Sequence, residues 1–203
     1  MEADTYRIKL PKLDLNTVDA KGKTLLEKSK KDNGMIPNMF SYMANYPALL
    51  ETYMNGYDSF RKEGGFTPAE QEVVFLTISA ENDCDYCMSG HAVAADLMSG
   101  VPVPVTEAIL ANKDVPDAKL GALSIFTSVM VNKRGNPSTA EVESFLKAGY
   151  TEKHILAIVH AIALKTISNY NNHLFGTPED AFLKTRDWTV YKVARSVVNF
   201  FRK

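Results

Sequence analysis

A succession of helix-length apolar segments, separated by glycine and proline, is the feature that most constrains the fold of this chain. The sharpest boundary lies at Thr67, Pro68 and Glu70, which combine a hydroxyl N-cap, a proline at the first helical position and a capping-box glutamate. Apolar residues recur at helical spacing after this start and in the other segments, and strand-like alternation is nowhere sustained. The sequence therefore predicts an all-α fold, a helical bundle.

The predicted helices cover most of the chain. We expect them at about 17–31, 47–62, 67–80, 84–99, 106–112, 117–132, 138–148, 151–174 and 178–202. Pro37 predicts a turn at 33–40, because proline prevents a regular helix there. Asn82 or Asp83 is the expected N-cap of the helix that begins at 84.

The length suits a single compact domain, which we place at 34–203, behind an N-terminal extension at 1–33. Within the domain, the segments 97–111 and 145–159 each join a helix end, a glycine and a new helix. This similarity predicts a weak internal helical repeat.

The composition restricts the class of protein. The 203 residues carry a formal net charge of -1 and no long basic stripe, which argues against nucleic acid as a partner. The longest strongly apolar run (155–164) is too short to span a bilayer, and the first residues contain no secretory h-region. We therefore expect a cytoplasmic protein with no membrane partner. In that compartment two neighbouring cysteines are more typical of a reversible redox or metal pair than of a permanent disulfide.

Both cysteines lie in the stretch CDYCMSGH, residues 84–91, together with one of the four histidines. On a helix, Cys84, Cys87 and His91 fall within a stripe of about 60° and face the same way. A Cys-x-x-Cys pair at the first turn of a helix combines a stabilised thiolate with a spacing that permits a disulfide. His91 lies one turn beyond Cys87 and is placed to act as the base that accepts its proton.

Glu72 is the fourth member of this predicted site. If the helices on either side of the END turn (81–83) form an antiparallel hairpin, Glu72 and His91 lie at the same level, because both are equally far from the turn. Apolar residues flank Glu72 on its own helix, and a carboxylate in such surroundings is costly unless it is paired or used. We therefore predict a relay from Glu72 through His91 to Cys87, with Cys84 as the partner thiol.

Two other interpretations of the cysteines stay open. The pair is also compatible with an inert buried position, or with zinc held by both thiolates, His91 and Glu72. No second C-x-x-C or H-x-H motif completes a zinc site, so we expect neither a metal nor another cofactor. Polar residues near a later helix end, Asn169, Asn172 and His173, are equally compatible with pocket lining, a subunit contact and helix capping.

Glu72, Cys84, Cys87 and His91 resemble the E-x11-C-x-x-C-x-x-x-H signature of the AhpD-like alkylhydroperoxidases, within the carboxymuconolactone decarboxylase family. The stretches GMIPNMF, CDYC, ALSIFTSVMVNKRG, KAGYT and NYNNHLFGTPED are similar to the peroxidase-related branch of that family. The resemblance covers about residues 34–180, and four functional residues at fixed spacing make it fairly specific.

The resemblance implies an AhpD-like helical subunit that forms a trimer or a hexamer and reduces hydroperoxides through its thiols, as an antioxidant enzyme. It implies that Cys87 is oxidised to a sulfenic acid, that Cys84 then forms the disulfide, and that Glu72 and His91 serve as the proton relay. The implied reductant is a dithiol, thioredoxin-like or lipoyl partner. Where the best-studied peroxidases of this type have a histidine before the second cysteine, this chain has Tyr86.

Two functions from other classes are alternatives. One is a zinc-holding or redox-sensing interaction module without enzymatic activity, which stoichiometric zinc in the purified protein would favour. The other is a carboxymuconolactone decarboxylase-like lyase in which the cysteines are incidental. Members of the family with the latter activity generally lack the cysteine pair, so the pair favours the peroxidase.

Overall fold

The computed structural model describes residues 5–184, 191–193 and 195, and every regular element among them is helical. The predicted all-α fold is confirmed. The elements are α1 (Ala20–Asn33), α2 (Asn38–Met43), α3 (Pro47–Glu63), α4 (Pro68–Glu81), α5 (Asp85–Ala94), the π-helical turn η1 (Ala95–Ser99), α6 (Val103–Leu110), α7 (Ala118–Asn132), α8 (Thr139–Lys147) and α9 (Glu152–Phe175). None of the described helices is long and apolar enough to cross a membrane.

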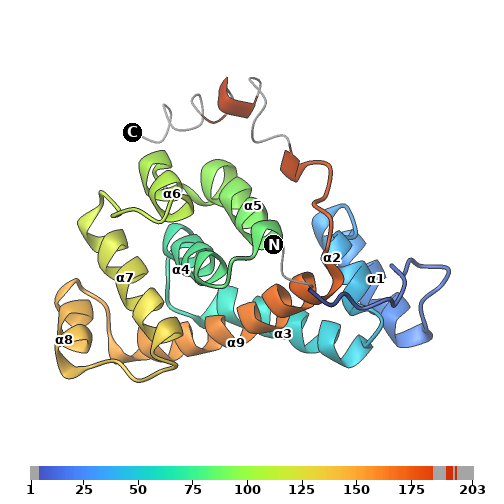
Figure 1. The fold of residues 1–203 in the computed structure, drawn as a ribbon, viewed down its shortest axis with the longest axis horizontal. Helices are drawn as coiled ribbons and strands as arrows, with labels where there is room; N and C mark the ends of the chain where they lie inside the picture. The colour runs from blue at the N-terminus through green and yellow to red at the C-terminus, as the bar shows by residue number, and fades with distance from the viewer. Residues whose placement is uncertain (1–4, 185–190, 194, 196–203) are drawn as a thin grey trace.

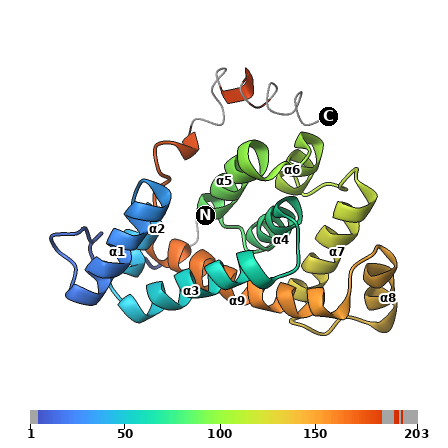
Figure 2. The same cartoon turned by 180° about the vertical axis from the view of Figure 1, so that it is seen from behind.

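Helix α4 lies at the centre of the bundle and packs against α5, α6, α7 and α9 (Figure 1). Helices α1 and α2 lie at the opposite end of the molecule from α8, as the view from behind also shows (Figure 2). The apolar side chains of α4 that are completely inaccessible to solvent are Val73, Val74, Phe75, Leu76 and Ile78. A helix that is apolar on most sides is stable only where other helices cover it, so α4 forms the core of the fold.

Side-chain caps fix the start of α4. The hydroxyl of Thr67 accepts a hydrogen bond from the backbone N–H of Glu70, whose carboxylate accepts one from the N–H of Thr67. The predicted capping box, with Pro68 at the first helical position, is therefore confirmed. These bonds satisfy backbone groups that the first turn of a helix leaves unpaired.

The turn at 81–83 joins α4 to α5 in a helical hairpin, as predicted. Asp83 has a φ of 50°, a left-handed conformation that aspartate adopts more readily than most residues. Because Asp83 is used in the turn, the next helix begins later, and its N-cap is Cys84. The prediction of Asn82 or Asp83 as the N-cap is wrong, and Cys84 lies directly at the N-terminus of α5.

Two other boundaries also differ from the sequence prediction. Helix α2 begins inside the predicted turn at 33–40, because Pro37 lies at its N-cap, where a missing N–H interrupts no helical hydrogen bond. Helix α6 begins at Val103 rather than at 106, since Pro104 occupies its first turn for the same reason.

The chain leaves α9 at Gly176 and rises towards α5 as the segment 177–184, which we call the strap (Figure 1). Gly176 has a φ of 56°, in the left-handed region that ends many helices. The helix predicted at 178–202 does not begin there, because residues 177–182 are not helical. Residues 191–193 and 195 are helical, and the rest of that predicted helix lies outside the described residues.

The N-terminal segment packs on the bundle. The N–H of Ile8 donates to the carbonyl of Leu174 at the end of α9, and Leu26 of α1 is fully buried against the core. The domain boundary expected after residue 33 stays a prediction. The proposed repeat also stays a prediction, although Gly100 and Gly149 both end a helix in the left-handed region before a new helix begins.

Candidate active site

Glu72 and His91 meet across the hairpin of α4 and α5. Nδ1 of His91 lies 2.7 Å from Oε2 of Glu72, and both side chains are buried. The imidazole also packs on the ring of Phe75, with 4.8 Å between the ring centroids. Since an ionised carboxylate only accepts hydrogen bonds, the proton resides on Nδ1 and leaves Nε2 as the accepting nitrogen. The predicted contact of Glu72 with His91 is present.

Arg61 of α3 is a second partner of the same carboxylate, and the sequence did not reveal it. Its Nη2 lies 2.5 Å from Oε1 of Glu72, and the guanidinium also donates to Tyr57 and Gln71. The other carboxylate oxygen is the one that contacts His91. Glu72 is thus held from two sides, which fixes the orientation of the imidazole as well.

These contacts set the charge state of the pair. Burial acts to raise the pKa of Glu72, but the interactions with His91 and Arg61 outweigh it and lower that pKa. Burial lowers the pKa of His91, and the charge of Lys165 lowers it further against the opposing effect of Glu72. At neutral pH, Glu72 is ionised and His91 is neutral, the form in which an imidazole can accept a proton.

Cys84 and Cys87 are both free thiols and both buried. Helix α9 provides polar groups to their sulfur atoms. Nδ2 of Asn172 donates to Sγ of Cys87 at 3.3 Å and lies 3.9 Å from Sγ of Cys84. Oγ of Ser168 lies 3.9 Å from Sγ of Cys87. Asn172 therefore contacts both thiols, although it does not line the cavity beside them, and the contact of Ser168 was not anticipated.

The two thiols differ in acidity. A hydrogen bond with Cys84 lowers the pKa of Cys87 well below that of an ordinary thiol, against the opposing effect of burial. The charge of Lys165 and the neighbouring His91 lower the pKa of Cys87 further. The same hydrogen bond, together with burial, raises the pKa of Cys84. Cys87 is therefore the thiolate of the pair, and Cys84 is the thiol that donates to it.

A cavity of about 270 Å³ opens beside Cys87 and His91. Helices α1, α2, α3, α5 and α9 and the strap contribute to its wall, which is aromatic and apolar around the reacting residues and carries charged groups from α1 and α3. The wall includes Lys28, Asp32, Phe40, Tyr53, Tyr57, Asp58, Tyr86, Gly90, Ala94, Lys165, Asp180, Phe182 and Leu183. Cys84 does not belong to this wall. A small apolar molecule that enters the cavity therefore meets Cys87 and not Cys84.

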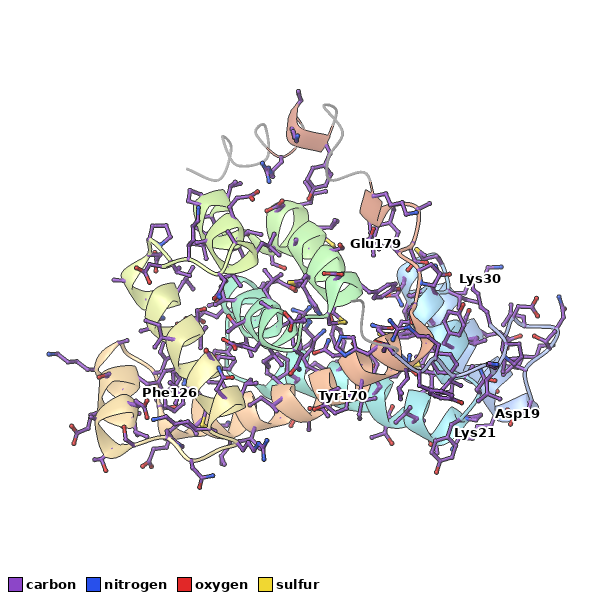
Figure 3. All side chains as sticks on the ribbon, viewed as in Figure 1. Asp19, Lys21, Lys30, Phe126, Tyr170 and Glu179 are labelled. Carbon is purple, nitrogen blue, oxygen red and sulfur yellow. The ribbon has the colours of Figure 1, made fainter. Side chains whose placement is uncertain are left out.

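Tyr86 closes one side of the cavity by holding the strap. Its hydroxyl donates to Oδ2 of Asp180 at 2.5 Å and lies 3.4 Å from the backbone N of Met39, which donates to it. Asp180 also accepts from the backbone N–H of Asn38, the first residue of α2. Figure 3 shows the strap beside α5, with Glu179 labelled on it. Glu179 accepts a hydrogen bond from Ser89 of α5. Tyr86 thus acts through the strap rather than on either sulfur.

Asn169 and His173 support the turn that precedes Cys84. Oδ1 of Asn169 accepts a hydrogen bond from Nδ2 of Asn82 at 2.9 Å. Nε2 of His173 lies 3.2 Å from the carbonyl oxygen of Asp83. Both residues therefore position the start of α5 from α9, and neither lines the cavity.

The zinc interpretation required Glu72 and His91 to join both thiolates around one ion. Among the residues that the structure describes, no three His, Cys, Asp or Glu side chains are grouped closely enough to hold a metal ion. The two oxygens of Glu72 are instead engaged by Arg61 and His91.

Residues 47–117 match the model of the Carboxymuconolactone decarboxylase family. This segment runs from the start of α3 to the N-cap of α7 and contains Glu72, both cysteines and His91. No curated protein matches the sequence.

Several solved structures share the fold. A peroxidase-related protein from Ralstonia eutropha JMP134, described as an alkylhydroperoxidase AhpD core, has a TM-score of 0.76 at 21% identity, over 87% of this chain and 94% of its own. A peroxidase-related protein from Silicibacter sp. TM1040 has a TM-score of 0.72 at 21% identity, over 89% and 94%. The debrominase Bmp8, bound to 2,3,4-tribromopyrrole, has a TM-score of 0.70 at 13% identity, over 96% and 100%. These structures confirm the predicted AhpD-like fold, and the family model matches residues 47–117, which contain the four residues on which the resemblance was based.

Proposed function

We propose that this chain is a thiol-dependent peroxidase of the AhpD-like carboxymuconolactone decarboxylase family, which reduces small hydroperoxides through Cys84 and Cys87. The observation that carries the proposal is the unequal access and acidity of the two thiols. Cys87 lines the cavity and has a lowered pKa, whereas Cys84 lies behind it with a raised pKa. A nucleophilic cysteine must be accessible to the peroxide and ionised, as Cys87 is. A resolving cysteine needs only to reach the oxidised sulfur and can remain a protonated thiol, as Cys84 does.

The first half of the proposed reaction oxidises Cys87. His91 accepts the proton of the Cys87 thiol, and Glu72 stabilises the imidazolium that forms. The thiolate attacks the terminal oxygen of the hydroperoxide, so an S–O bond forms as the O–O bond breaks and the electron pair leaves on the alkoxide oxygen. The imidazolium returns its proton to that oxygen. The products are an alcohol and a sulfenic acid on Cys87.

The second half restores the dithiol. The sulfur of Cys84 attacks the sulfur of Cys87, an S–S bond forms, and the sulfenic oxygen leaves as water with the proton of Cys84. A small dithiol, a thioredoxin-like protein or a lipoyl group then opens the disulfide by thiol exchange and is itself oxidised to a disulfide. The two halves balance, because one hydroperoxide is reduced to an alcohol and water for each external dithiol that is oxidised.

Mass spectrometry of the thiols tests this cycle directly. One equivalent of hydroperoxide should remove two hydrogen atoms from the dithiol protein and place a disulfide between Cys84 and Cys87. Stopped-flow measurement of peroxide consumption with a dithiol reductant should show turnover in the wild type and none in Cys87→Ser. Wild-type turnover by Cys87→Ser contradicts the mechanism.

We also propose that the protein is a homo-oligomer, a trimer or a hexamer. Large apolar side chains on neighbouring helices α7 and α9 are exposed: Ile125, Leu156, Val159 and Tyr170. Tyr170 lies on the outer side of α9 (Figure 3). Exposed apolar groups gathered on adjacent elements are typical of an interface, and a second copy of this chain is the partner that the family resemblance implies.

The lyase alternative makes a different prediction about the cysteines. A variant with both cysteines replaced by serine should lose peroxide turnover, whereas lactone turnover by that variant would favour the lyase. Stoichiometric zinc in protein purified without a chelator would favour the zinc-holding module instead. Each of these measurements separates one alternative from the peroxidase.

A further inference from the structure

Lys165 has no assigned role, although it is the one lysine that is buried among the described residues, with 1% of its surface exposed. No described residue accepts a hydrogen bond from its Nζ, which lies 5.7 Å from the centroid of the Phe75 ring. An ammonium removed from water without acceptors is costly, so such a group is normally paired or used. Lys165 lies in α9 directly after the apolar residues 155–164, so its own helix provides few polar groups that could solvate the ammonium.

Lys165 belongs to the wall of the same cavity as Cys87. The ionisable groups that share this wall or pack against it are Lys28, Asp32, Tyr53, Tyr57, Asp58, Arg61, Glu72, Tyr86, Cys87, His91 and Asp180. Lys28 pairs with Asp32 and Asp58, and Asp180 accepts hydrogen bonds from Tyr86 and from the backbone of Asn38. Arg61 and Glu72 balance each other through their ion pair. The charge of Lys165 is one of the causes that lower the pKa of Cys87, so the Cys87 thiolate is the negative group at the reacting end of the cavity on which Lys165 acts.

We propose that Lys165 is a further catalytic residue: its ammonium pairs with the Cys87 thiolate in the dithiol state and then stabilises the negative charge on the leaving oxygen of the hydroperoxide. This inference rests on the peroxide reduction proposed above. As the S–O bond forms and the O–O bond breaks, one negative charge moves from Sγ of Cys87 to the alkoxide oxygen. A fixed cation in the wall of the same cavity compensates this charge as it moves, and a site protected from water strengthens that effect.

The same charge also distinguishes hydroperoxides from neutral alkylating agents. Iodoacetamide reacts with the thiolate but releases iodide, a weakly basic anion that needs little stabilisation. An alkoxide is strongly basic and gains much more from an adjacent cation. The ratio of the two rate constants therefore reports the assistance given to the leaving oxygen, separately from the ionisation of Cys87.

The test compares the wild type with Lys165→Met. Methionine is close to lysine in shape and apolar, and replacing a buried charge by an apolar group of similar volume is generally tolerated. Alkylation of Cys87 by iodoacetamide is measured as a function of pH to find where each protein is fully ionised. At that pH, the rate of reaction with tert-butyl hydroperoxide is measured and divided by the alkylation rate.

Lys165→Met should shift the alkylation profile to higher pH and lower the rate ratio by about 100–1,000-fold, the scale seen when one charge-stabilising donor is removed. Lys165→Arg should recover part of the ratio, because it restores the positive charge. The matched control is Lys21→Met, which removes an exposed ammonium paired with Glu51 outside the cavity and should leave both rates unchanged.

An unchanged ratio in Lys165→Met overturns the role at the leaving oxygen, while the proposed peroxidase function stands. A wild type whose Cys87 is alkylated readily but consumes no hydroperoxide overturns the proposed function and this role with it. If Lys165→Met fails to fold, Lys165→Gln removes the charge with a polar side chain and is judged by the same ratio.

Discussion

Replacing Glu72 by Gln perturbs the charge network behind Cys87 while preserving its shape. The carboxylate is 1% exposed and accepts one hydrogen bond from Arg61 and one from Nδ1 of His91. Glutamine offers one oxygen and one amide nitrogen, so an N–H group must face one of these two donors. Loss of a charge-assisted bond beside a partly buried guanidinium should lower the free energy of unfolding by about 2–4 kcal/mol. For a chain of this length, the melting temperature should fall by roughly 5–15 °C.

The same substitution should change the acidity of Cys87. Glu72 stabilises the imidazolium that forms when His91 accepts the thiol proton, and a hydrogen bond to a charged group contributes about 1.5–3 kcal/mol. Since about 1.4 kcal/mol corresponds to one pKa unit, the apparent pKa of Cys87 in alkylation should rise by about one to two units in Glu72→Gln. Its reactivity should fall at neutral pH and recover as the pH is raised.

The pH dependence of the unfolding free energy tests whether Glu72 stabilises the fold in its ionised form. The pKa of Glu72 is lowered in the folded protein, so its contribution is fully present above its ordinary value of 4.5 and is lost as the pH falls through the native pKa. The difference in unfolding free energy between the wild type and Glu72→Gln should therefore be constant at neutral pH and shrink in acid. Urea unfolding at several pH values measures this difference.

Glu70→Gln is the matched control, because Glu70 lies two residues earlier on the same helix and pairs with Lys119 outside the cavity. It should reduce stability by at most about 1 kcal/mol, since glutamine is also a capping-box residue, and leave the alkylation profile of Cys87 unchanged. A Glu72→Gln variant with a lowered melting temperature but an unchanged alkylation profile would refute the relay and leave Glu72 a structural role. If both measurements are unchanged, the paired geometry itself is refuted.

Three shorter predictions concern other parts of the molecule. Cys84→Ser should let the sulfenic acid on Cys87 accumulate after peroxide treatment, and a sulfenic-acid-specific probe should label it; no label would contradict the assignment of Cys84 as the resolving thiol. Tyr86→Phe removes the hydrogen bond to Asp180 and should lower the unfolding free energy by about 1–3 kcal/mol. Trypsin should then cleave the strap faster, and an unchanged cleavage rate would show that Tyr86 does not hold the strap in place. Leu156→Lys should reduce the mass in sedimentation equilibrium to that of a monomer; an unchanged oligomer would place the interface elsewhere.

The contact between Glu72 and His91 could be predicted because it depends on local rules. The capping box at Thr67 and the turn at 81–83 fix where α4 begins and where the chain reverses. Helical periodicity then places residues equally far from the turn at the same level. The error at the N-cap of α5 did not disturb this relation, because it moved the helix start by one or two residues and left the hairpin intact.

Arg61, Lys165 and Ser168 could not be placed in the same way. Their helices, α3 and α9, reach the site through packing between segments far apart in the sequence, and no local pattern specifies which of their side chains face Cys87. Lys165 did leave one signal, because it is a lysine that directly follows the apolar run 155–164. A buried charge loses its hydration, and this loss destabilises the fold unless a partner offsets it. A lysine in apolar surroundings therefore indicates either a buried ion pair or a functional residue.

The charge balance at Cys87 also links the two oxidation states of the site. In the dithiol state, the thiolate and Lys165 offset each other, and Arg61 offsets Glu72. Formation of the disulfide removes the thiolate charge but leaves the ammonium buried, with no described hydrogen-bond acceptor. The fold therefore stabilises the reduced form relative to the disulfide, and a disulfide whose reduced form is stabilised is a stronger oxidant. This stabilisation favours peroxidase turnover. Oxidation by the peroxide is irreversible, and a disulfide with a higher reduction potential is reduced more readily by the external dithiol. Lys165→Met should consequently lower the reduction potential of the pair.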